Sequence, residues 1–159
     1  MNYQRYHDGQ LFMVRWRHPT VEASDQLGAE MEQYHERLGE PLFMGVIVGP
    51  DCVAPDPQAR EALLRGHDRI YDCCLCIRMV FLGATLRQSL MRSVVTGITI
   101  ATGLRGKGIA VDRSVGALAR TTQQMLGCDP AEVLRRLESA GMLDATELAT
   151  AQADLQRIK

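Results

Sequence analysis

The pattern of apolar and polar positions predicts that the chain opens with a β-hairpin. Two short β-type runs, residues 3–7 and 11–17, flank Asp8-Gly9, a strong signal for a two-residue hairpin turn. Apolar residues fall on both faces of the second run, with Phe12, Val14 and Trp16 on one face and Leu11 and Met13 on the other. We therefore expect an antiparallel pair whose second strand lies inside the sheet.

A helix and a buried strand are predicted next. Pro19-Thr20 supplies a helix start, and the helix is expected to end near Gly39. Its apolar stripe has spacings of four, three and four residues and consists of Leu27, Met31, Tyr34 and Leu38. Residues 42–48 form a glycine-spaced apolar run that is typical of a buried strand, and this run stops at Gly49.

A second helix and a central strand follow. Asp56-Pro57 reads as an N-cap with proline at the first helical position. Residues 73–82 are nearly all apolar, with Arg78 as the one charge, which favours a parallel strand covered on both faces. On regular strand geometry, Cys74 and Cys76 would share a face.

Residues 83–103 form the most unusual segment, a long helical pattern whose only charges are Arg87 and Arg92. Its expected inward stripe is Leu86, Leu90, Val94, Ile98 and Ala101, widened by Met91 and Val95. Uncharged polar residues flank this stripe. A short strand over residues 109–112 and a helix over 115–126, capped by Ser114, complete the alternation.

Two further helices are predicted after Gly127. Asp129 with Glu132 and Asp144 with Glu147 are capping-box-like starts fifteen residues apart. An isolated helical hairpin of this size is marginally stable, so it must dock on the rest of the chain or on a partner. We expect an α/β domain over residues 1–127 and a helical hairpin extension over residues 128–159. The domain should hold a mainly parallel five-stranded sheet opened by an antiparallel hairpin.

Composition and charge exclude several classes of protein. Of the 159 residues, 46% are hydrophobic and 23% charged, as in an ordinary soluble domain. Eighteen basic and nineteen acidic residues give a net charge of −1, which gives no reason to expect nucleic-acid binding. No apolar stretch is long enough to span a membrane, and the first residues lack an apolar signal segment, so we expect a cytoplasmic protein.

The five cysteines, Cys52, Cys73, Cys74, Cys76 and Cys128, predict neither disulfides nor a metal site. Their number is odd, and no His or Cys pair at zinc-finger spacing accompanies Cys74 and Cys76. We interpret them as small buried hydrophobes in a reducing compartment, and expect no metal and no cofactor.

The element order over residues 1–127 resembles the STAS fold, the family of bacterial anti-sigma-factor antagonists, stressosome subunits and the cytoplasmic domain of sulfate transporters. Residues 82–97, LGATLRQSLMRSVVTG, are also similar to a phrase in uncharacterised STAS-like bacterial proteins. The resemblance implies a role in signalling. In phosphorylated members, a Ser or Thr at the start of the second helix is the kinase target. The corresponding segment here, GPDCVAPDP over residues 49–57, contains neither, so the resemblance implies no phosphorylation switch at that place.

An enzyme is the weakest interpretation of this sequence. The four histidines, His7, His18, His35 and His67, form no catalytic arrangement in the sequence. Cys52 is the better candidate nucleophile, because it follows the carboxyl end of a predicted parallel strand and precedes a helix start. No histidine lies near it in sequence, and we expect no catalytic residues.

The leading hypothesis is a non-catalytic cytosolic interaction module in bacterial signalling that binds a protein partner or self-associates as a homodimer. The predicted contact surface combines the loop before the second helix with the nearly uncharged helix and comprises Asp51, Cys52, Asp56, Thr85, Ser89, Arg92, Ser93 and Thr96. Alternatively, the C-terminal hairpin covers this helix within the chain. A further alternative is a binding protein for a small apolar or anionic, lipid-like ligand at the carboxyl ends of the strands.

Charge is distributed unevenly around this helix. Residues 21–40 contain six acidic residues against one arginine, and residues 83–128 contain six basic residues against one aspartate. Two such surfaces can meet between chains or steer a charged partner.

Overall fold

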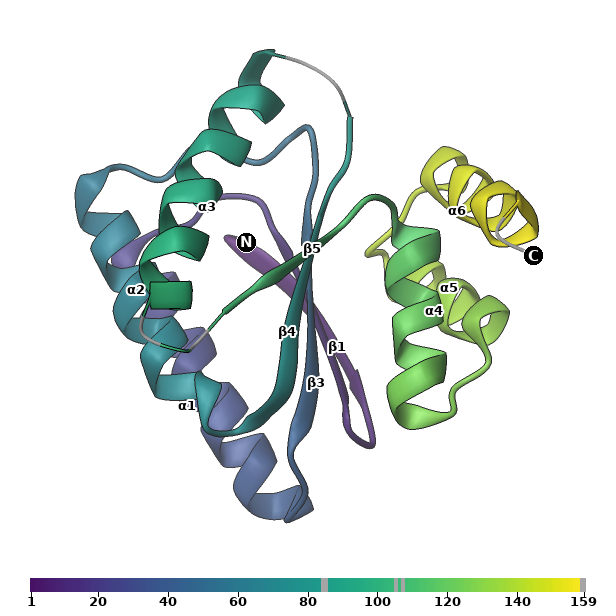
Figure 1. The fold of residues 1–159 in the computed structure, drawn as a ribbon, viewed down its shortest axis with the longest axis horizontal. Helices are drawn as coiled ribbons and strands as arrows, with labels where there is room; N and C mark the ends of the chain where they lie inside the picture. The colour runs from purple at the N-terminus through teal and green to yellow at the C-terminus, as the bar shows by residue number, and fades with distance from the viewer. Residues whose placement is uncertain (84–85, 105, 107, 158–159) are drawn as a thin grey trace.

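The computed structural model describes residues 1–83, 86–104, 106 and 108–157, and within them the fold is α/β (Figure 1). The strands are β1 (Tyr3–Asp8), β2 (Leu11–Trp16), β3 (Leu42–Val48), β4 (Cys74–Phe81) and β5 (Ala110–Asp112). They form one mixed sheet in the order β1-β2-β3-β4-β5. The β1–β2 pair is antiparallel and every later pair is parallel, which confirms the predicted fold class.

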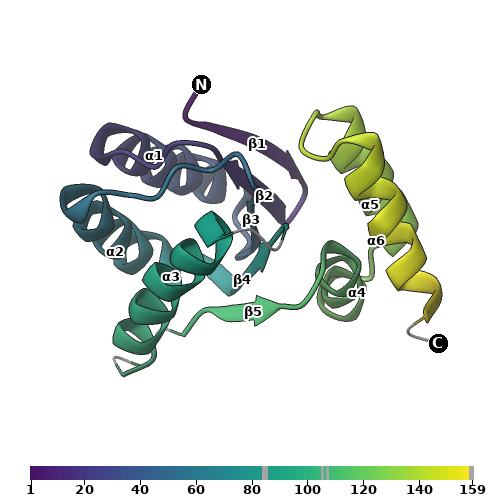
Figure 2. The same cartoon turned by 90° about the horizontal axis from the view of Figure 1, so that it is seen from above.

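Helices cover both faces of the sheet. They are α1 (Val21–Leu38), α2 (Pro57–Tyr71), α3 (Leu86–Leu104), α4 (Val115–Leu126), α5 (Pro130–Ser139) and α6 (Ala145–Arg157). Figure 2 shows α1, α2 and α3 on one face and α4, α5 and α6 on the other. The crossovers β2-α1-β3, β3-α2-β4 and β4-α3-β5 therefore all run over the same face. Because α4, α5 and α6 cover the other face, both faces of the central strands are buried.

The opening hairpin confirms the expected alternation in β2. Phe12, Val14 and Trp16 pack in the core on the α1–α3 face, and Leu11 and Met13 pack in the core on the α4–α6 face. The six residues of β2 are all buried, because the strand lies between β1 and β3 and carries helices on both sides.

The predicted helix starts are confirmed by side-chain caps. Thr20 accepts a hydrogen bond from Ala23 N at 3.1 Å, and Ser114 accepts one from Ala117 N at 3.1 Å. Each satisfies a backbone donor that the first turn of a helix leaves unpaired. Helix α1 ends at Gly39, whose φ of 74° is the left-handed conformation that glycine adopts at low cost.

The expectation that Cys74 and Cys76 share a face of the sheet is wrong. The pairing of β3 with β4 shifts by one residue, since Leu42 lies opposite Cys74 and Phe43 lies opposite Cys76. The extra residue, Leu75, is a β-bulge, and it reverses the alternation that follows. Cys74 therefore packs with the α1–α3 core and Cys76 with the α4–α6 core.

Helix α3 turns the described part of its predicted apolar stripe inward, since Val94 and Ile98 line the same cavity as Met91 and Val95. Met91 and Val95, expected only to widen the stripe, are its buried apolar residues, together with the hydroxyl-bearing Thr102. Val94 and Ile98 are only partly buried. The side chains of Leu86 and Leu90, also expected in the stripe, lie outside the described residues.

The C-terminal hairpin docks on the rest of the chain. Val133, Leu134 and Leu137 of α5 are buried in the same core layer as Phe43 and Ile47 of β3. The alternative that this hairpin covers α3 is wrong, because α5 and α6 lie on the opposite face of the sheet (Figure 2). Among the described residues, no helix combines the length and apolarity needed to cross a membrane.

Candidate functional site

The loop between β3 and α2 contains an aspartate that is held by two arginines. Asp51 accepts a hydrogen bond from Arg15 Nη2 at 3.2 Å and forms an ion pair with Arg17. Burial alone would raise the pKa of Asp51, but the hydrogen bond from Arg15 and the charges of both arginines outweigh it and lower that pKa. The carboxylate is therefore a structural partner of β2 and is ionised at neutral pH.

Arg15 is the centre of this ion-pair network. Its side chain is only 8% exposed, and its guanidinium also binds Glu147, with 2.6 Å between Nη1 and Oε2. The same Nη1 donates to the carbonyl oxygen of Met142 at 2.8 Å. Because Asp51 and Glu147 balance the charges of Arg15 and Arg17, this end of the sheet offers little net positive charge to an anionic ligand.

Cys52 and Asp56 also have roles inside the fold. Cys52 is fully buried in the α1–α3 core, with its Sγ 3.6 Å from the carbonyl oxygen of Val53. Asp56 caps α2 by accepting a hydrogen bond from Ala59 N at 2.8 Å. The sequence places no histidine near Cys52, yet the fold brings His67 of α2 to the same internal cavity.

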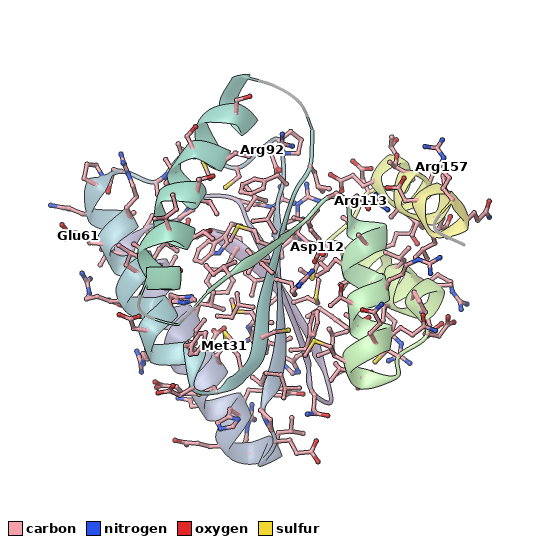
Figure 3. The ribbon with its side chains drawn as sticks, in the orientation of Figure 1. Met31, Glu61, Arg92, Asp112, Arg113 and Arg157 are labelled. Atoms are coloured by element: carbon pink, nitrogen blue, oxygen red, sulfur yellow. The ribbon has the colours of Figure 1, made fainter. Side chains whose placement is uncertain are left out.

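The outward face of α3 carries the remaining predicted contact residues. Ser89, Arg92, Ser93 and Thr96 are exposed, and Thr85 lies outside the described residues. The guanidinium of Arg92 lies 5.8 Å from the centre of the Phe81 ring, and Figure 3 shows Arg92 near the upper part of α3. Ile100 extends this face and is 59% exposed, which is unusual for a large aliphatic side chain.

Strand β5 forms the sheet edge nearest to α3. Val111 pairs in register with Met79, which lines the cavity on the α3 side, so Val111 projects toward that same face. Val111 is nevertheless 53% exposed. On the other face, Arg78 Nη2 binds Asp112 Oδ1 at 2.5 Å and fixes β5 to β4.

The structure therefore divides the predicted contact surface into two parts. Asp51, Cys52 and Asp56 hold the fold together at the carboxyl end of β3. The described residues of α3 form an exposed face with one positive charge, that of Arg92. Asp51 and Asp56 remain exposed in these roles, and α3 and β5 provide a further accessible surface that carries few charges.

The acidic face of α1 is partly neutralised within the chain. Glu30 pairs with Arg5 of β1 at 2.7 Å, and Glu32 forms two 2.6 Å hydrogen bonds with Arg69 of α2. These contacts reduce the charge available for a contact between α1 and a basic partner surface.

The described thiols and carboxylates do not come together as a metal centre. Burial is the largest cause that raises the pKa of Cys74, to about 12, and burial also raises the pKa of Cys73 and Cys76. Protonated thiols are poor metal ligands and poor nucleophiles. Within the described residues, no group of three or more His, Cys, Asp or Glu side chains is arranged to hold a metal ion.

Comparison with protein-family models, with curated proteins and with solved structures found no match to this chain. Its function must therefore be argued from the geometry.

Sequence reasoning missed two features, Arg15 and the cavity beneath α3. A signal for Arg15 was present, since it is the one charge in the apolar run LFMVRW, where a buried charge requires a partner. Its partners lie 36 and 132 residues away, so only the fold identifies them. An apolar ligand was among the alternatives drawn from the sequence, but the position of the cavity depends on how three helices pack over the sheet.

Proposed function

We propose that this protein is a non-catalytic interaction module of bacterial regulation, a STAS-like domain of the cytoplasm, and that it self-associates as a homodimer. The proposed contact surface is the outer face of α3 together with the edge strand β5. The observation that carries the proposal is the exposure of Ile100 of α3 and Val111 of β5, at 59% and 53%.

The charge of α3 supports a surface that contacts a copy of itself. Its sequence contains no acidic residue, and among its described exposed side chains only Arg92 is charged. A two-fold axis brings the same residues of both copies together, so a surface with few charges avoids repulsion between like charges. Exposed faces of soluble helices usually carry many more charges.

The edge strand supports the same arrangement. Strand β5 pairs with β4 along one side only, which leaves the backbone groups of its other side available to a second strand. A two-fold axis beside β5 would align two copies antiparallel and bring their Val111 side chains close together. Gly97, which is exposed on α3, allows a second helix to approach closely.

Light scattering and sedimentation velocity over a wide concentration range test the proposal. We expect a dimer for the wild-type protein and a monomer for Val111→Lys and Ile100→Glu. Met125→Lys is the matched control, because Met125 is 43% exposed but lies on α4, on the opposite face of the sheet. A wild-type monomer at every concentration would overturn the proposal, as would a Val111→Lys protein that dimerises like the wild type.

A further inference from the structure

A partly open cavity of about 100 Å³ lies between the sheet and the three helices of the α1–α3 face. The sheet contributes Met44, Val46 and Met79, and α3 closes the cavity with Met91, Val95 and Ile98. Protein interiors are normally packed with few voids larger than a water molecule. A cavity of this size therefore requires an explanation.

The walls of the cavity are mainly apolar, with Ser24 and the buried His67 as polar side chains, and no Asp, Glu, Lys or Arg is among the described residues that line it. A carboxylate or phosphate placed there would lose its hydration without gaining a counter-charge. The cavity therefore suits an uncharged ligand better than an anionic one. An apolar cavity of about 150 Å³ is large enough to bind benzene, so one of 100 Å³ suits a smaller molecule, with about four to six non-hydrogen atoms.

One buried hydroxyl in the cavity wall lacks a partner. Ser24 of α1 is 4% exposed, and its Oγ has no hydrogen-bond partner among the described residues. A serine within a helix commonly donates to the carbonyl oxygen four residues earlier, but in this helix only the backbone N–H of Ser24 binds Thr20 O. Buried side-chain hydroxyls nearly always have a partner, so Ser24 Oγ is a ready donor or acceptor for a bound molecule.

The glycine opposite Ser24 keeps this part of the cavity open. Gly66 of α2 lines the cavity, and a Cβ added to it would meet no atom closer than Ser24 O, at 3.9 Å. Close packing of α1 on α2 therefore does not require glycine at this position. A larger residue would fill space that the present sequence leaves empty, and it would also favour the helix.

We propose that this cavity binds a small, uncharged, mainly apolar molecule with a single hydroxyl or carbonyl group. The apolar part would contact the methionine and valine side chains, and the polar group would form a hydrogen bond with Ser24 Oγ. This inference is independent of self-association, because it concerns the buried side of α3 and not its outer face.

Methyl NMR of methionine-labelled protein tests the inference, because Met44, Met79 and Met91 line the cavity and Met13 and Met142 are buried in the opposite core layer. We expect 1-butanol to cause saturable shifts of the first three methyl signals and none of the other two. Xenon, which has no polar group, should shift the same three signals. Shifts that rise linearly, or that affect all buried methionines equally, would overturn the proposal.

Two variants separate the role of Ser24 from the role of the cavity. Ser24→Ala should weaken 1-butanol binding several-fold and leave xenon binding unchanged, whereas Ser93→Ala, at an exposed serine of α3, should change neither. Gly66→Leu should abolish binding of both probes and raise the melting temperature, since it fills the cavity. If Ser24→Ala binds 1-butanol as tightly as the wild type, the assignment of the hydroxyl is wrong.

Discussion

Arg15 of β2 forms a two-pronged ion pair with Glu147 of α6, with Nη1 2.6 Å from Oε2 and Nη2 3.1 Å from Oε1. The same carboxylate accepts a hydrogen bond from Asp144 N at 2.9 Å, and Asp144 in turn caps the helix at Glu147 N. The predicted capping box at Asp144 and Glu147 is thus confirmed. Through Arg15, Glu147 also attaches the C-terminal hairpin to β2.

Removing Arg15 should loosen this attachment. Arg15→Met leaves Glu147, whose side chain is 14% exposed, without its cation, and we expect a loss of about 3 kcal/mol in the free energy of unfolding. Urea titration followed by circular dichroism measures the loss. The control is Arg135→Met, which removes an exposed pair with Glu132 on the same helix and should leave stability nearly unchanged. Equal effects of the two substitutions would contradict the network's structural role.

The protein should lose part of its stability in acid through Asp51. The pKa of Asp51 is lower in the folded protein than in the unfolded chain. Its contribution to the free energy of unfolding is therefore fully present above the unfolded pKa of about 3.9, and this contribution is lost as the pH falls through the folded pKa. Asp51→Asn should reduce this acid-dependent part of the unfolding free energy. A variant whose stability falls with acid as steeply as that of the wild type would contradict the expectation.

Two glycines within helices should respond oppositely to alanine. At Gly116 of α4, an added Cβ would lie 2.8 Å from Ala151 O of α6, so Gly116→Ala should cost about 1–3 kcal/mol by forcing the two helices apart. At Gly97 of α3, no described atom outside the helix's own backbone lies within 4 Å of an added Cβ, and Gly97→Ala should stabilise the monomer by about 0.5–1 kcal/mol. Thermal and urea unfolding measure both changes.

The cysteines should react slowly with alkylating reagents in the folded protein. Cys52 is fully buried, and the pKa of Cys74 is raised to about 12, so few thiolates are accessible at about pH 8. Mass spectrometry after iodoacetamide treatment, with urea-unfolded protein as the reference, gives the rate at each site. Rapid modification of Cys52 in the folded protein would instead favour the enzymatic interpretation.

Arg92→Glu should weaken self-association while leaving the fold nearly intact. The substitution places a negative charge on α3 in both copies, so the two surfaces would repel each other. Losing the contact between Arg92 and the Phe81 ring should cost no more than about 1 kcal/mol of stability. Sedimentation and thermal unfolding of the same sample separate the two effects. An equal loss of both would indicate that this helix face contributes mainly to folding.

Much of the fold was predictable from short-range signals. The hairpin turn at Asp8-Gly9 and the caps at Thr20 and Asp56 depend on residues within a few positions of one another. The strand β4 was predicted as an element, but its bulge at Leu75 was not, because a bulge depends on the register with β3. That one residue decided which core layer each cysteine of β4 joined.

The candidate site was predictable only in part. The unusual polarity of α3 is a property of the sequence, and the structure places Ser93 and Thr96 on the exposed face of that helix, where a contact surface stays a prediction. The two loop aspartates expected at the contact surface instead have partners within the chain. Asp51 pairs with Arg15, and Asp56 caps the N-terminus of α2. Their partners could not be chosen from sequence, since many arginines and backbone donors were equally plausible.

The sequence by itself determined the order and type of the elements, because hydrophobic period, caps and turns act over a few residues. The tertiary structure alone decided that the C-terminal hairpin covers the face opposite α3, that Arg15 joins β2 to α6, and that a cavity remains beneath α3. These features depend on contacts between residues far apart in the chain. Such contacts are selected by the packing of whole layers and not by any local pattern.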